Sequence, residues 1–412
     1  MAWSEGNASF KVLHIIPSIG PLRGGPSIAV RTMAEGLASQ GIAVDVVTTD
    51  DNGPQRLAVP LGKPILHNGV NYWHFRRHIK FYTISWSLFK WLLLNLRKYD
   101  VVHIHGLFSF AATAGALCAA YYDVPYVVRP LGVLNAWGIR NRRPFLKKLS
   151  LNLIERRIIS RAAAVQFTSE QEKCEAEMVG GCAQGVVIPI PVAAFKVDRN
   201  SKDELIRLKY PELAGKTILL FLSRLDPIKG LNLLFDGLAK IRLAQPNVAL
   251  LVAGTGEESF VTRLRKQTER LGIQEHVIWT GFIEGHDKHD ALAVADMFIL
   301  PSYSENFGMA VVEAMASGLP VVVSDRVGIH REIEEAEAGV VVRCDSDSIS
   351  RAVINLLENH EERTQKARNA LLLAERFSSP AVCRALVGLY NNLDTRRSLP
   401  ICAASVSDYS DS

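Results

Sequence analysis

The stretch that most constrains the fold of this chain lies at residues 299–325 and reads ILPSYSENFGMAVVEAMASGLPVVVSD. It continues an apolar run, Met297–Leu300, that ends at a proline. Good helix formers begin near Phe307, and Gly318 ends that helix just before the β-branched run Val321–Val323. Strand, loop, helix and strand in this order predict a βαβ unit of a parallel sheet. The loop and the helix start then lie at the carboxyl edge of the sheet, where ligands bind in such folds.

Two glutamates in this stretch, Glu305 and Glu313, stand eight residues apart, one in the loop and one in the second turn of the helix. Both can face one cleft. The backbone N–H groups near Asn306, Phe307 and Gly308 belong to the helix start, where unpaired donors and the helix dipole favour phosphate or sugar oxygens. A carboxylate beside such an anion site is better suited to accept hydrogen bonds from hydroxyls. A sugar nucleotide carries both kinds of group, although the pair alone is also typical of solvated side chains.

The segment SENFGMAVVEAMASGLPVV, which contains both glutamates, resembles the signature of the retaining glycosyltransferases of family 4, a group 1 family. The resemblance implies the α/β fold called GT-B, in which two Rossmann-like domains with parallel sheets face each other across a cleft. It implies that Glu305 contacts hydroxyls of the donor sugar near the reacting carbon, and that Glu313 holds the ribose hydroxyls of the nucleotide. The backbone of residues 306–308 would meet the sugar and the diphosphate, with Met309 also in the donor site.

A second segment, RLDPIKG at residues 224–230, follows a predicted strand at residues 217–222. Its two cations, Arg224 and Lys229, flank a turn at the carboxyl end of that strand. They suit a leaving diphosphate, whose negative charge grows as the sugar bond breaks. The pattern R-L-x-x-x-K-G is similar to the diphosphate-binding segment of the same family, and a chance pair of surface charges is the alternative.

Two later strands of this half end at Gly254 and Gly281, which adds two further loops to the expected sheet edge. By the resemblance, the loop after Gly281, with Phe282 and Ile283, holds the nucleotide base. It would do so largely through backbone groups, so its side chains do not name the base.

The N-terminal half offers a glycine loop and a histidine. Gly24 and Gly25 stand between an apolar strand and a helix, as in a phosphate-binding loop or a plain tight turn. The resemblance places them near the donor phosphate and the acceptor. The apolar strand Val101–His105 ends in His105, where the family has a histidine that touches the donor sugar, whereas His103 is expected to pack.

Two positions depart from the family pattern. Leu131 stands where many relatives have a histidine, so Arg129 is the residue expected to offer a charge to the acceptor or the diphosphate instead. The passage between the two halves contains Pro189-Ile190-Pro191 where the family usually has Pro-Asn-Gly, which predicts a stiffer hinge.

Charge is divided unevenly along the chain. Residues 1–200 hold 23 Lys and Arg against 13 Asp and Glu, a balance of +10, whereas residues 201–412 hold 24 against 29, a balance of −5. The stretch 129–161 has nine cations and one acid, with leucines at roughly helical spacing, and fits either an anionic membrane surface or a solvated helix face. Stacking aromatics are too sparse there for nucleic acid. The candidates for contact with the acceptor or the membrane are Arg129, Arg140, Arg142, Arg143, Lys147 and Lys148.

A second apolar and basic stretch, residues 79–98, is rich in Trp, Phe and Leu. It is too short and too interrupted to span a bilayer, so it predicts a buried core helix, with a helix lying on a membrane surface as the alternative.

The sequence shows no apolar run of 18 residues and no signal-peptide pattern. Six cysteines without a CxxC pair argue against a zinc site or a disulfide framework. We therefore expect a cytoplasmic protein, with peripheral attachment to the inner face of the cell membrane as an option.

The length of 412 residues and the restart of strand and helix alternation predict two domains. We expect an acceptor-binding Rossmann-like domain at residues 1–190, with a last helix at residues 380–394 packing back on it. A nucleotide-sugar-binding Rossmann-like domain is expected at residues 198–379. The polar residues 395–412 are expected to form a disordered tail.

Together these features predict a retaining hexosyltransferase that moves a sugar from a nucleotide diphosphate sugar to a hydroxyl of a glycan or lipid-linked acceptor, in cell-surface polysaccharide or lipopolysaccharide biosynthesis. No cofactor and no metal is expected, because Arg224 and Lys229 supply the charge that a divalent ion would supply, and no DxD acidic pair is recognised at a strand end. Two alternatives stay open. One is a sugar-nucleotide epimerase of the same fold, and the other is a non-catalytic protein that binds nucleotide sugars.

Overall fold

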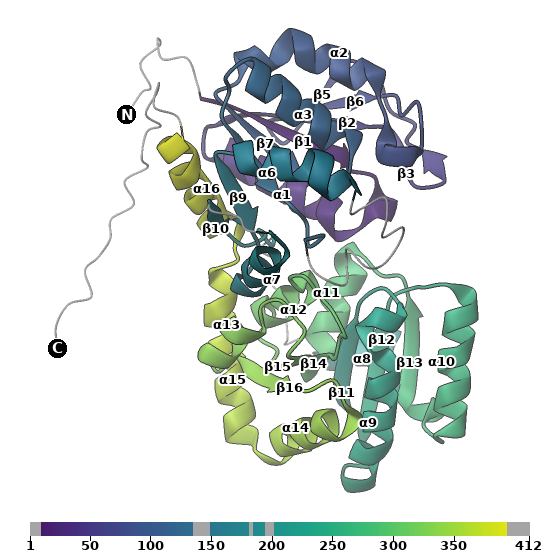
Figure 1. Cartoon of the computed structure of the whole chain (residues 1–412). Helices are drawn as coiled ribbons and strands as arrows, with labels where there is room; N and C mark the ends of the chain where they lie inside the picture. The colour runs from purple at the N-terminus through teal and green to yellow at the C-terminus, as the bar shows by residue number, and fades with distance from the viewer. Residues whose placement is uncertain (1–9, 135–148, 181–183, 194–201, 394–412) are drawn as a thin grey trace, which may run out of the picture. The chain divides into compact units, whose positions relative to one another are not determined.

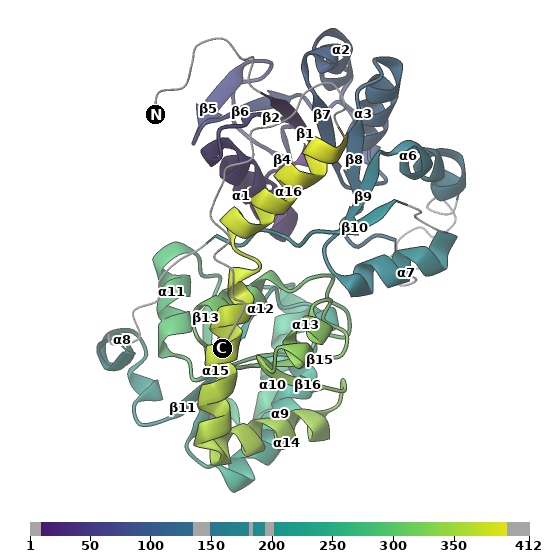
Figure 2. The ribbon, with the colours of Figure 1, turned by 90° about the vertical axis from the view of Figure 1, so that its left-hand side faces the viewer.

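The structure is a computed structural model that describes residues 10–134, 149–180, 184–193 and 202–393. The chain divides into two compact units, each an α/β body with a largely parallel sheet (Figures 1 and 2). Unit 1 takes residues 1–129, 145–165 and 383–412, and unit 2 takes residues 130–144 and 166–382. The tail expected at residues 395–412 lies outside the described residues.

The sheet of unit 1 is built around β1, Lys11–Ser18, whose apolar residues are buried. In register, Lys11 pairs with Ala43 of β2 on one side, and Val12 pairs with Val101 of β7 on the other, both in parallel. The sheet order is β10-β9-β8-β7-β1-β2-β6-β5, with β5 antiparallel to β6; β10 and the last two residues of β9 fall among the residues of unit 2. The other strands are β2 Ala43–Thr49, β5 Pro64–His67, β6 Val70–Phe75, β7 Val101–His105, β8 Tyr126–Arg129, β9 Ala164–Phe167 and β10 Gly185–Val187. A separate antiparallel ribbon joins β3, Asp51–Asn52, to β4, Gln55–Arg56.

Two of the helices of unit 1, α2 and α3, begin at a serine that caps them. The side chain of Ser85 accepts a hydrogen bond from the Leu88 N–H at the start of α2, and that of Ser109 accepts one from the Ala112 N–H at the start of α3. The helices are α1 Gly25–Ser39, α2 Trp86–Asn95, α3 Phe110–Tyr121 and α6 Arg156–Arg161, which follows a π-helical turn at Leu151–Glu155. Single 3₁₀ turns lie at Pro21–Arg23, Phe81–Thr83 and Leu96–Lys98.

The last helix, α16, spans Ser379–Leu393, and its residues from Cys383 onward belong to unit 1. There the thiol of Cys383 lies 3.7 Å from the carbonyl oxygen of Met33, and the fully buried Tyr390 is hydrogen-bonded to His103 at 2.7 Å. This helix therefore covers part of the core of unit 1.

Unit 2 contains a six-stranded sheet in which every pair of neighbours is parallel, in the order β13-β12-β11-β14-β15-β16. Its strands β12, β14 and β15 are buried at every residue, as expected for a parallel sheet covered on both faces. The strands are β11 Thr217–Leu222, β12 Val248–Ala253, β13 Val277–Gly281, β14 Met297–Leu300, β15 Val321–Ser324 and β16 Gly339–Val342.

From β11 to β16 one α-helix separates each pair of successive strands, in the alternation that parallel strands require. These helices are α9 Leu231–Ala244, α10 Glu258–Arg270, α11 Gly285–Val294, α12 Met309–Ala316 and α13 His330–Glu335. The helices α7 Glu170–Gly180 and α8 Lys202–Lys209 precede this sheet, and α14 Ser346–Glu358 and α15 His360–Glu375 follow it. The predicted βαβ unit is present as β14, α12 and β15. The helix begins at Met309, two residues later than predicted, because Gly308 adopts a φ of +97° and interrupts the helical backbone.

The stretch 79–98 forms neither a fully buried helix nor one long helix. It contains the 3₁₀ turn at Phe81–Thr83, helix α2 and a second 3₁₀ turn, and α2 has Leu88 and Leu92 buried while Trp86 is exposed. The prediction of a buried core helix therefore holds for one face of α2 only. Among the described helices, none combines the length and the apolar character that crossing a membrane requires.

Candidate active site

At the carboxyl edge of the sheet in unit 2, Lys229 and Glu305 form an ion pair. Lys229 ends a 3₁₀ turn, Pro227–Lys229, that is capped by the side chain of Asp226. The next residue, Gly230, has a φ of +70°, and a Cβ there would lie 2.0 Å from the carbonyl oxygen of Pro301. Only glycine fits this close approach, which brings the turn against the loop after β14 and leaves Lys229 only 8% exposed.

The backbone of Glu305 is fixed on its other side by the loop after β15. Its N–H donates to the carbonyl of Arg326 at 3.0 Å, and its carbonyl accepts from the N–H of Gly328 at 2.8 Å. A Cβ on Gly328 would lie 1.9 Å from the carbonyl oxygen of Asn306. The loops after β11, β14 and β15 are thus held together around one carboxylate.

The second glutamate of the signature, Glu313, also has a lysine partner. Its Oε1 lies 2.8 Å from the Nζ of Lys288 on α11, and the two side chains are only 14% and 23% exposed. Lys288 was not identified from the sequence, because it lies 25 positions from its partner and outside any recognised motif. Each of the two carboxylates is therefore partly buried and charge-compensated.

Between the two glutamates, the start of α12 has no side-chain cap. The Phe307 side chain is 2% exposed and packs edge-on against Phe377, with ring centres 5.6 Å apart. The Phe307 side chain is therefore not available to a ligand, and the contact expected for the backbone of residues 306–308 stays a prediction. Uncapped N–H groups at a helix start provide donors for an anion.

A pocket of about 590 Å³ lies at the same edge, around the ends of β12 and β13. Gly254 and Gly281 both line it, and a Cβ on Gly254 would lie 1.9 Å from the carbonyl oxygen of Ser223. One wall is formed by Trp279, over whose ring the guanidinium of Arg265 lies at 4.8 Å. The residues that follow Gly281 differ in exposure, Phe282 being 68% exposed and Ile283 partly buried. Arg224, also exposed, makes no ion pair with any residue that the structure describes.

A buried glutamate that sequence reasoning missed, Glu172, organises the neighbourhood of Asn306. Its carboxylate accepts hydrogen bonds from the N–H of Gly132 at 2.7 Å and from the N–H and hydroxyl of Thr168 at 2.7 and 2.6 Å. The Thr168 hydroxyl in turn accepts from the side-chain amide of Asn306 at 3.2 Å. Leu131, where a histidine was expected from the family pattern, has a φ of +63°, which is unusual for a leucine.

In unit 1, the glycine loop after β1 is held by the acidic ribbon residue Asp51. Gly24 has a φ of +67° and precedes α1, which starts at Gly25. The 1%-exposed Asp51 forms ion pairs with Arg23, at 2.5 Å, and with Arg77. The carboxylate of Asp51 was not identified from the sequence. It fixes the glycine loop, which was identified.

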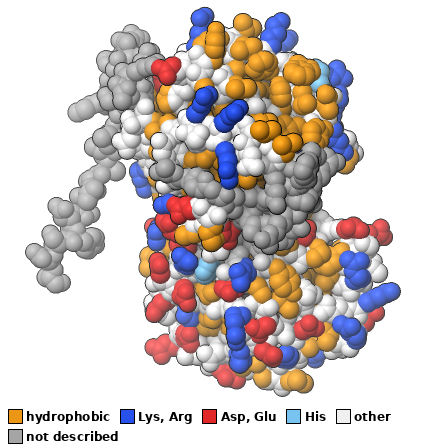
Figure 3. Space-filling view, viewed as in Figure 1, with side chains coloured by type: hydrophobic (Ala, Val, Ile, Leu, Met, Phe, Trp, Pro, Cys, Tyr) orange, Lys and Arg blue, Asp and Glu red, His pale blue; other side chains and the backbone are white. Residues whose placement is uncertain are grey.

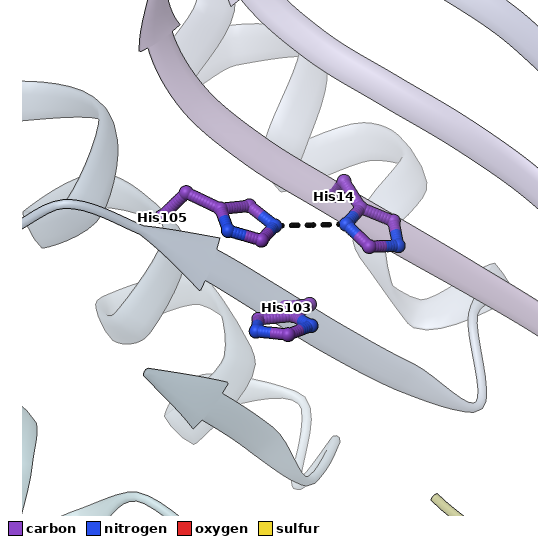
Figure 4. Close-up of side chains that lie close together, drawn as sticks. All are labelled: His14, His103 and His105. Carbon is purple, nitrogen blue, oxygen red and sulfur yellow. Dashed lines mark hydrogen bonds between the residues drawn. The ribbon is translucent and has the colours of Figure 1, made fainter. Parts of the chain in front are cut away.

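His105 lies in a cluster of three buried histidines (Figure 4). His14 of β1 stands in register with His103 of β7, and His105 follows two residues later on the same face. The Nδ1 of His14 and the Nε2 of His105 are 2.8 Å apart in a hydrogen bond. Burial, with a smaller contribution from Arg129, lowers the pKa of His14 to about 3, and burial also holds the pKa of His105 well below its usual range. Both imidazoles are therefore neutral at pH 7.

Nitrogen atoms of the three histidines lie within 4.8 Å of one another, a spacing that a metal ion could use. The rings of His14 and His105 are stacked, with an angle of 7° between them, and their facing nitrogens bond to each other. The charge of Arg129 also acts on both. These features favour a neutral hydrogen-bonded cluster over a cation site.

Arg129 is itself fully buried at the end of β8. The prediction that it contacts a membrane is therefore wrong, because a side chain with no exposed surface cannot reach lipid headgroups. The other basic candidates, Arg140, Arg142, Arg143, Lys147 and Lys148, lie outside the described residues.

The prediction that no DxD pair stands at a strand end is also wrong. Asp345-Ser346-Asp347 follows β16. Asp345 caps α14 by accepting from the Ser348 N–H at 2.7 Å, and Asp347 lies 2.6 Å from the ammonium of Lys240. Both carboxylates thus have structural partners.

Two sequence models of known families match this chain. A sequence model described as "Glycosyl transferases group 1" matches residues 202–372, and one described as "Glycosyl transferase 4-like domain" matches residues 24–191. The chain belongs to the group 1 glycosyltransferases. Gly25 and Glu305 of this glycosyltransferase both fall within the matched ranges.

Relatives of this glycosyltransferase include an uncharacterized glycosyltransferase of Methanocaldococcus jannaschii, 27% identical over 89% of the present chain and 94% of the relative. A phosphatidyl-myo-inositol mannosyltransferase of Mycolicibacterium smegmatis is 28% identical over 74% of this chain and 73% of its own length. None of the relatives compared supports the epimerase alternative.

Solved structures identify the fold. HepE from Anabaena, in complex with UDP and glucose, superposes with a TM-score of 0.74 at 20% identity, covering 93% of this chain and 100% of HepE. Sucrose-phosphate synthase from Thermosynechococcus elongatus gives 0.74 at 21% identity, covering 93% and 99%. The predicted GT-B fold is confirmed.

Proposed function

We propose that this glycosyltransferase moves a sugar from a nucleotide diphosphate sugar to a hydroxyl of a glycan or lipid-linked acceptor, with retention of the anomeric configuration. The observation that carries the proposal is the pair of lysine-compensated carboxylates, Glu305 and Glu313, on either side of the uncapped start of α12. Carboxylates that accept from hydroxyls beside donors for a diphosphate match the two kinds of group in a sugar nucleotide. HepE, whose complex contains UDP and glucose, supports this class of donor.

In the proposed complex, Glu313 accepts hydrogen bonds from the ribose hydroxyls, and the pocket near Gly254 and Gly281 takes the base. Arg224 and Lys229 meet the diphosphate, since they are the cations at the end of β11. Lys229 then shares its charge between the diphosphate and Glu305. This leaves Glu305 free to accept from a hydroxyl of the sugar.

The bond from the anomeric carbon to the diphosphate oxygen breaks, and a bond from that carbon to the acceptor oxygen forms on the same face. The acceptor proton passes to the leaving diphosphate. Two cations and the start of α12 stabilise the growing charge, so the proposal needs no metal ion and no cofactor.

The acceptor belongs to the same proposal. The name of the mycobacterial relatives refers to mannosyl transfer onto a phosphatidyl-inositol, and WaaG, of the same fold, is described as acting in lipopolysaccharide biosynthesis. We place the reaction in the synthesis of a cell-surface polysaccharide or lipopolysaccharide, at the inner face of the cell membrane. The sugar and the base are left to experiment.

The test is a panel of UDP-, GDP- and ADP-sugars, scored by thermal shift with EDTA and again with Mg²⁺. The proposal predicts that one donor raises the melting temperature equally in both conditions. Product analysis by NMR with an added acceptor then reads the anomeric configuration. Stabilisation that requires Mg²⁺ would remove the metal-independent mechanism, and no stabilisation by any donor would favour a non-catalytic protein. Isomerised donor in the absence of acceptor would instead support an epimerase.

A further inference from the structure

Two neighbouring helices of unit 1, α2 and α3, expose large hydrophobic side chains to solvent. We name this surface the α2–α3 face and define it by Trp86, Leu93 and Leu94 of α2 and by Leu117 and Tyr121 of α3. These side chains are between 38% and 76% exposed. Figure 3 shows hydrophobic side chains gathered over this part of unit 1, with Lys and Arg among and around them.

The two helices run side by side in the same direction. At their starts, the ring of Trp86 lies 5.4 Å from that of Phe110, and at their ends the hydroxyl of Tyr122 donates to the carbonyl of Leu93 at 2.5 Å. The exposed side chains therefore stand on one continuous surface of two packed helices.

The packing of α2 against the core does not require its hydrophobic side chains to be exposed. Its exposed residues are spaced so that they share one side of the helix. The buried ones, Leu88 and Leu92, occupy the opposite side, and Leu96 of the following 3₁₀ turn is buried as well. One stripe of leucines on α2 thus already packs into the core. A second apolar stripe facing water is costly in a free protein and is typical of a surface that binds a partner.

The charge around the face is predominantly positive. Between Asp51 and Asp100 the sequence contains no acid, whereas it contains eight Lys and Arg. Lys90 is exposed on α2 itself, Lys80 is exposed shortly before the helix, and Arg97 and Lys98 are exposed in the 3₁₀ turn that follows it. The acids that border the region are Asp100, which accepts from the Lys11 N–H at 2.8 Å, and Asp123 just after α3.

The loop before α2 adds to the same surface. Ile79 and Phe81 are 46% and 55% exposed, and the intervening backbone is strained, with Tyr82 at a φ of +56°. The hydroxyl of Tyr82 donates to the buried carboxylate of Glu155 at 2.6 Å. This bond holds the loop in the conformation that leaves Phe81 outside.

We propose that the α2–α3 face rests on a lipid bilayer with anionic headgroups. Leucines, a tryptophan and a tyrosine suit the boundary between headgroups and acyl chains, and lysine and arginine stems reach from that depth to phosphates. The absence of acids from the stretch that forms α2 matches a negative surface. This contact rests on the proposed location of the reaction at the inner face of the cell membrane, but it needs no sugar donor and is therefore tested separately from the reaction.

The experiment is co-sedimentation of the full chain with large unilamellar vesicles in 150 mM salt, without nucleotide sugar. Vesicles of phosphatidylcholine alone are compared with vesicles that contain about one third phosphatidylglycerol. We expect binding to the anionic vesicles and little to the neutral ones. Wild-type protein that stays in the supernatant with both would overturn the proposal.

Two variants locate the contact. Leu94→Ser/Leu117→Ser is expected to weaken binding at least about ten-fold, because two leucines no longer enter the apolar layer. Lys90→Ala is expected to weaken it about five-fold. The matched controls on unit 2 are Leu208→Ser/Leu243→Ser, whose side chains are more exposed than those of Leu94 and Leu117, and Lys266→Ala, which is also exposed; both controls should leave binding unchanged.

Other outcomes are equally decisive. Equal losses in the test and control variants would show binding that does not use this face. If the leucine variant instead abolishes a dimer seen by light scattering, while wild type ignores vesicles, the face is a contact between copies and the lipid proposal is wrong. Donor binding by thermal shift, measured on the same variants, separates these results from any failure of the proposed reaction.

Discussion

The Nζ of Lys288 lies 2.8 Å from the Oε1 of Glu313, although the two residues stand on different helices, α11 and α12. Both side chains are largely removed from water. A carboxylate in such a place retains its charge because the ammonium compensates it. The same arrangement recurs at Glu305 with Lys229, so the donor-side carboxylates are held ready as charged acceptors.

Replacing Glu313 by glutamine should weaken the binding of the nucleotide diphosphate about ten-fold to hundred-fold. The substitution removes charge-assisted hydrogen bonds to the proposed ribose hydroxyls and leaves Lys288 without its carboxylate partner. Isothermal titration with the donor nucleotide measures the effect. Glu361→Gln, an exposed site on α15, is the control. Unchanged affinity in Glu313→Gln would exclude this residue from the nucleotide site.

Gly230→Ala should lower the free energy of unfolding by about 3 kcal/mol or more. A Cβ there meets the carbonyl oxygen of Pro301 at 2.0 Å, and the φ of +70° already strains any other residue. Gly272→Ala is the matched control, because Gly272 has a φ of +65° and open space around its Cβ. The control should cost only about 1 kcal/mol. Urea unfolding of both variants gives the comparison, and equal losses would contradict the steric argument.

Protonation of the histidine cluster should destabilise the protein as the pH falls below the ordinary histidine value. The folded-state pKa of His14 is lowered from 6.5 to about 3, so the unfolded chain takes up a proton there before the folded chain does. The contribution of His14 to the free energy of unfolding is therefore complete above pH 6.5, and it is lost on acidification between about pH 6.5 and 3. From pH 6.5 to pH 5 this single group accounts for about 2 kcal/mol.

The measurement that isolates this effect is the difference in unfolding free energy between wild type and His14→Leu, taken at pH 7 and pH 5. The variant is less stable at pH 7, where it lacks the bond to His105, and should lose less on acidification. Parallel losses in the two proteins would show that His14 does not titrate in this way.

Glu172→Gln should lower the free energy of unfolding by about 1–3 kcal/mol. The carboxylate is 5% exposed and accepts three hydrogen bonds, which an amide cannot all reproduce. Glu175→Gln on the same helix serves as the control, since its carboxylate is less buried and accepts from Gln171 alone among the described contacts. Thermal unfolding followed by circular dichroism measures the stability of both variants. A Glu172 variant as stable as the control would show that these three hydrogen bonds do not stabilise the fold.

The sequence predicted the parts of the site that local order determines. The unit of β14, α12 and β15, the turn that holds Lys229 and the strand that ends at His105 all follow from the spacing of apolar residues, glycines and polar strand ends. The position of the helix start was two residues off because a single glycine, Gly308, takes a left-handed φ that propensity does not reveal.

What the sequence did not predict depends on contacts between distant residues. Lys288, Glu172 and Asp51 meet their partners only after the strands are ordered in the sheets, and no motif marks them. Arg129 was misassigned for the same reason, since a basic stretch does not reveal which of its members turns inward. The histidine cluster could have been anticipated, because His14 and His103 occupy equivalent places on neighbouring parallel strands.

The most direct test of the central claim is the rate of sugar transfer by Glu305→Gln, measured together with its affinity for the donor that stabilises the wild type. The account predicts a loss of at least about hundred-fold in turnover, from the loss of a contact to the reacting sugar, with donor affinity changed by less than about ten-fold. Turnover equal to wild type would contradict it, because the carboxylate at the centre of the proposed site would then have no part in the reaction.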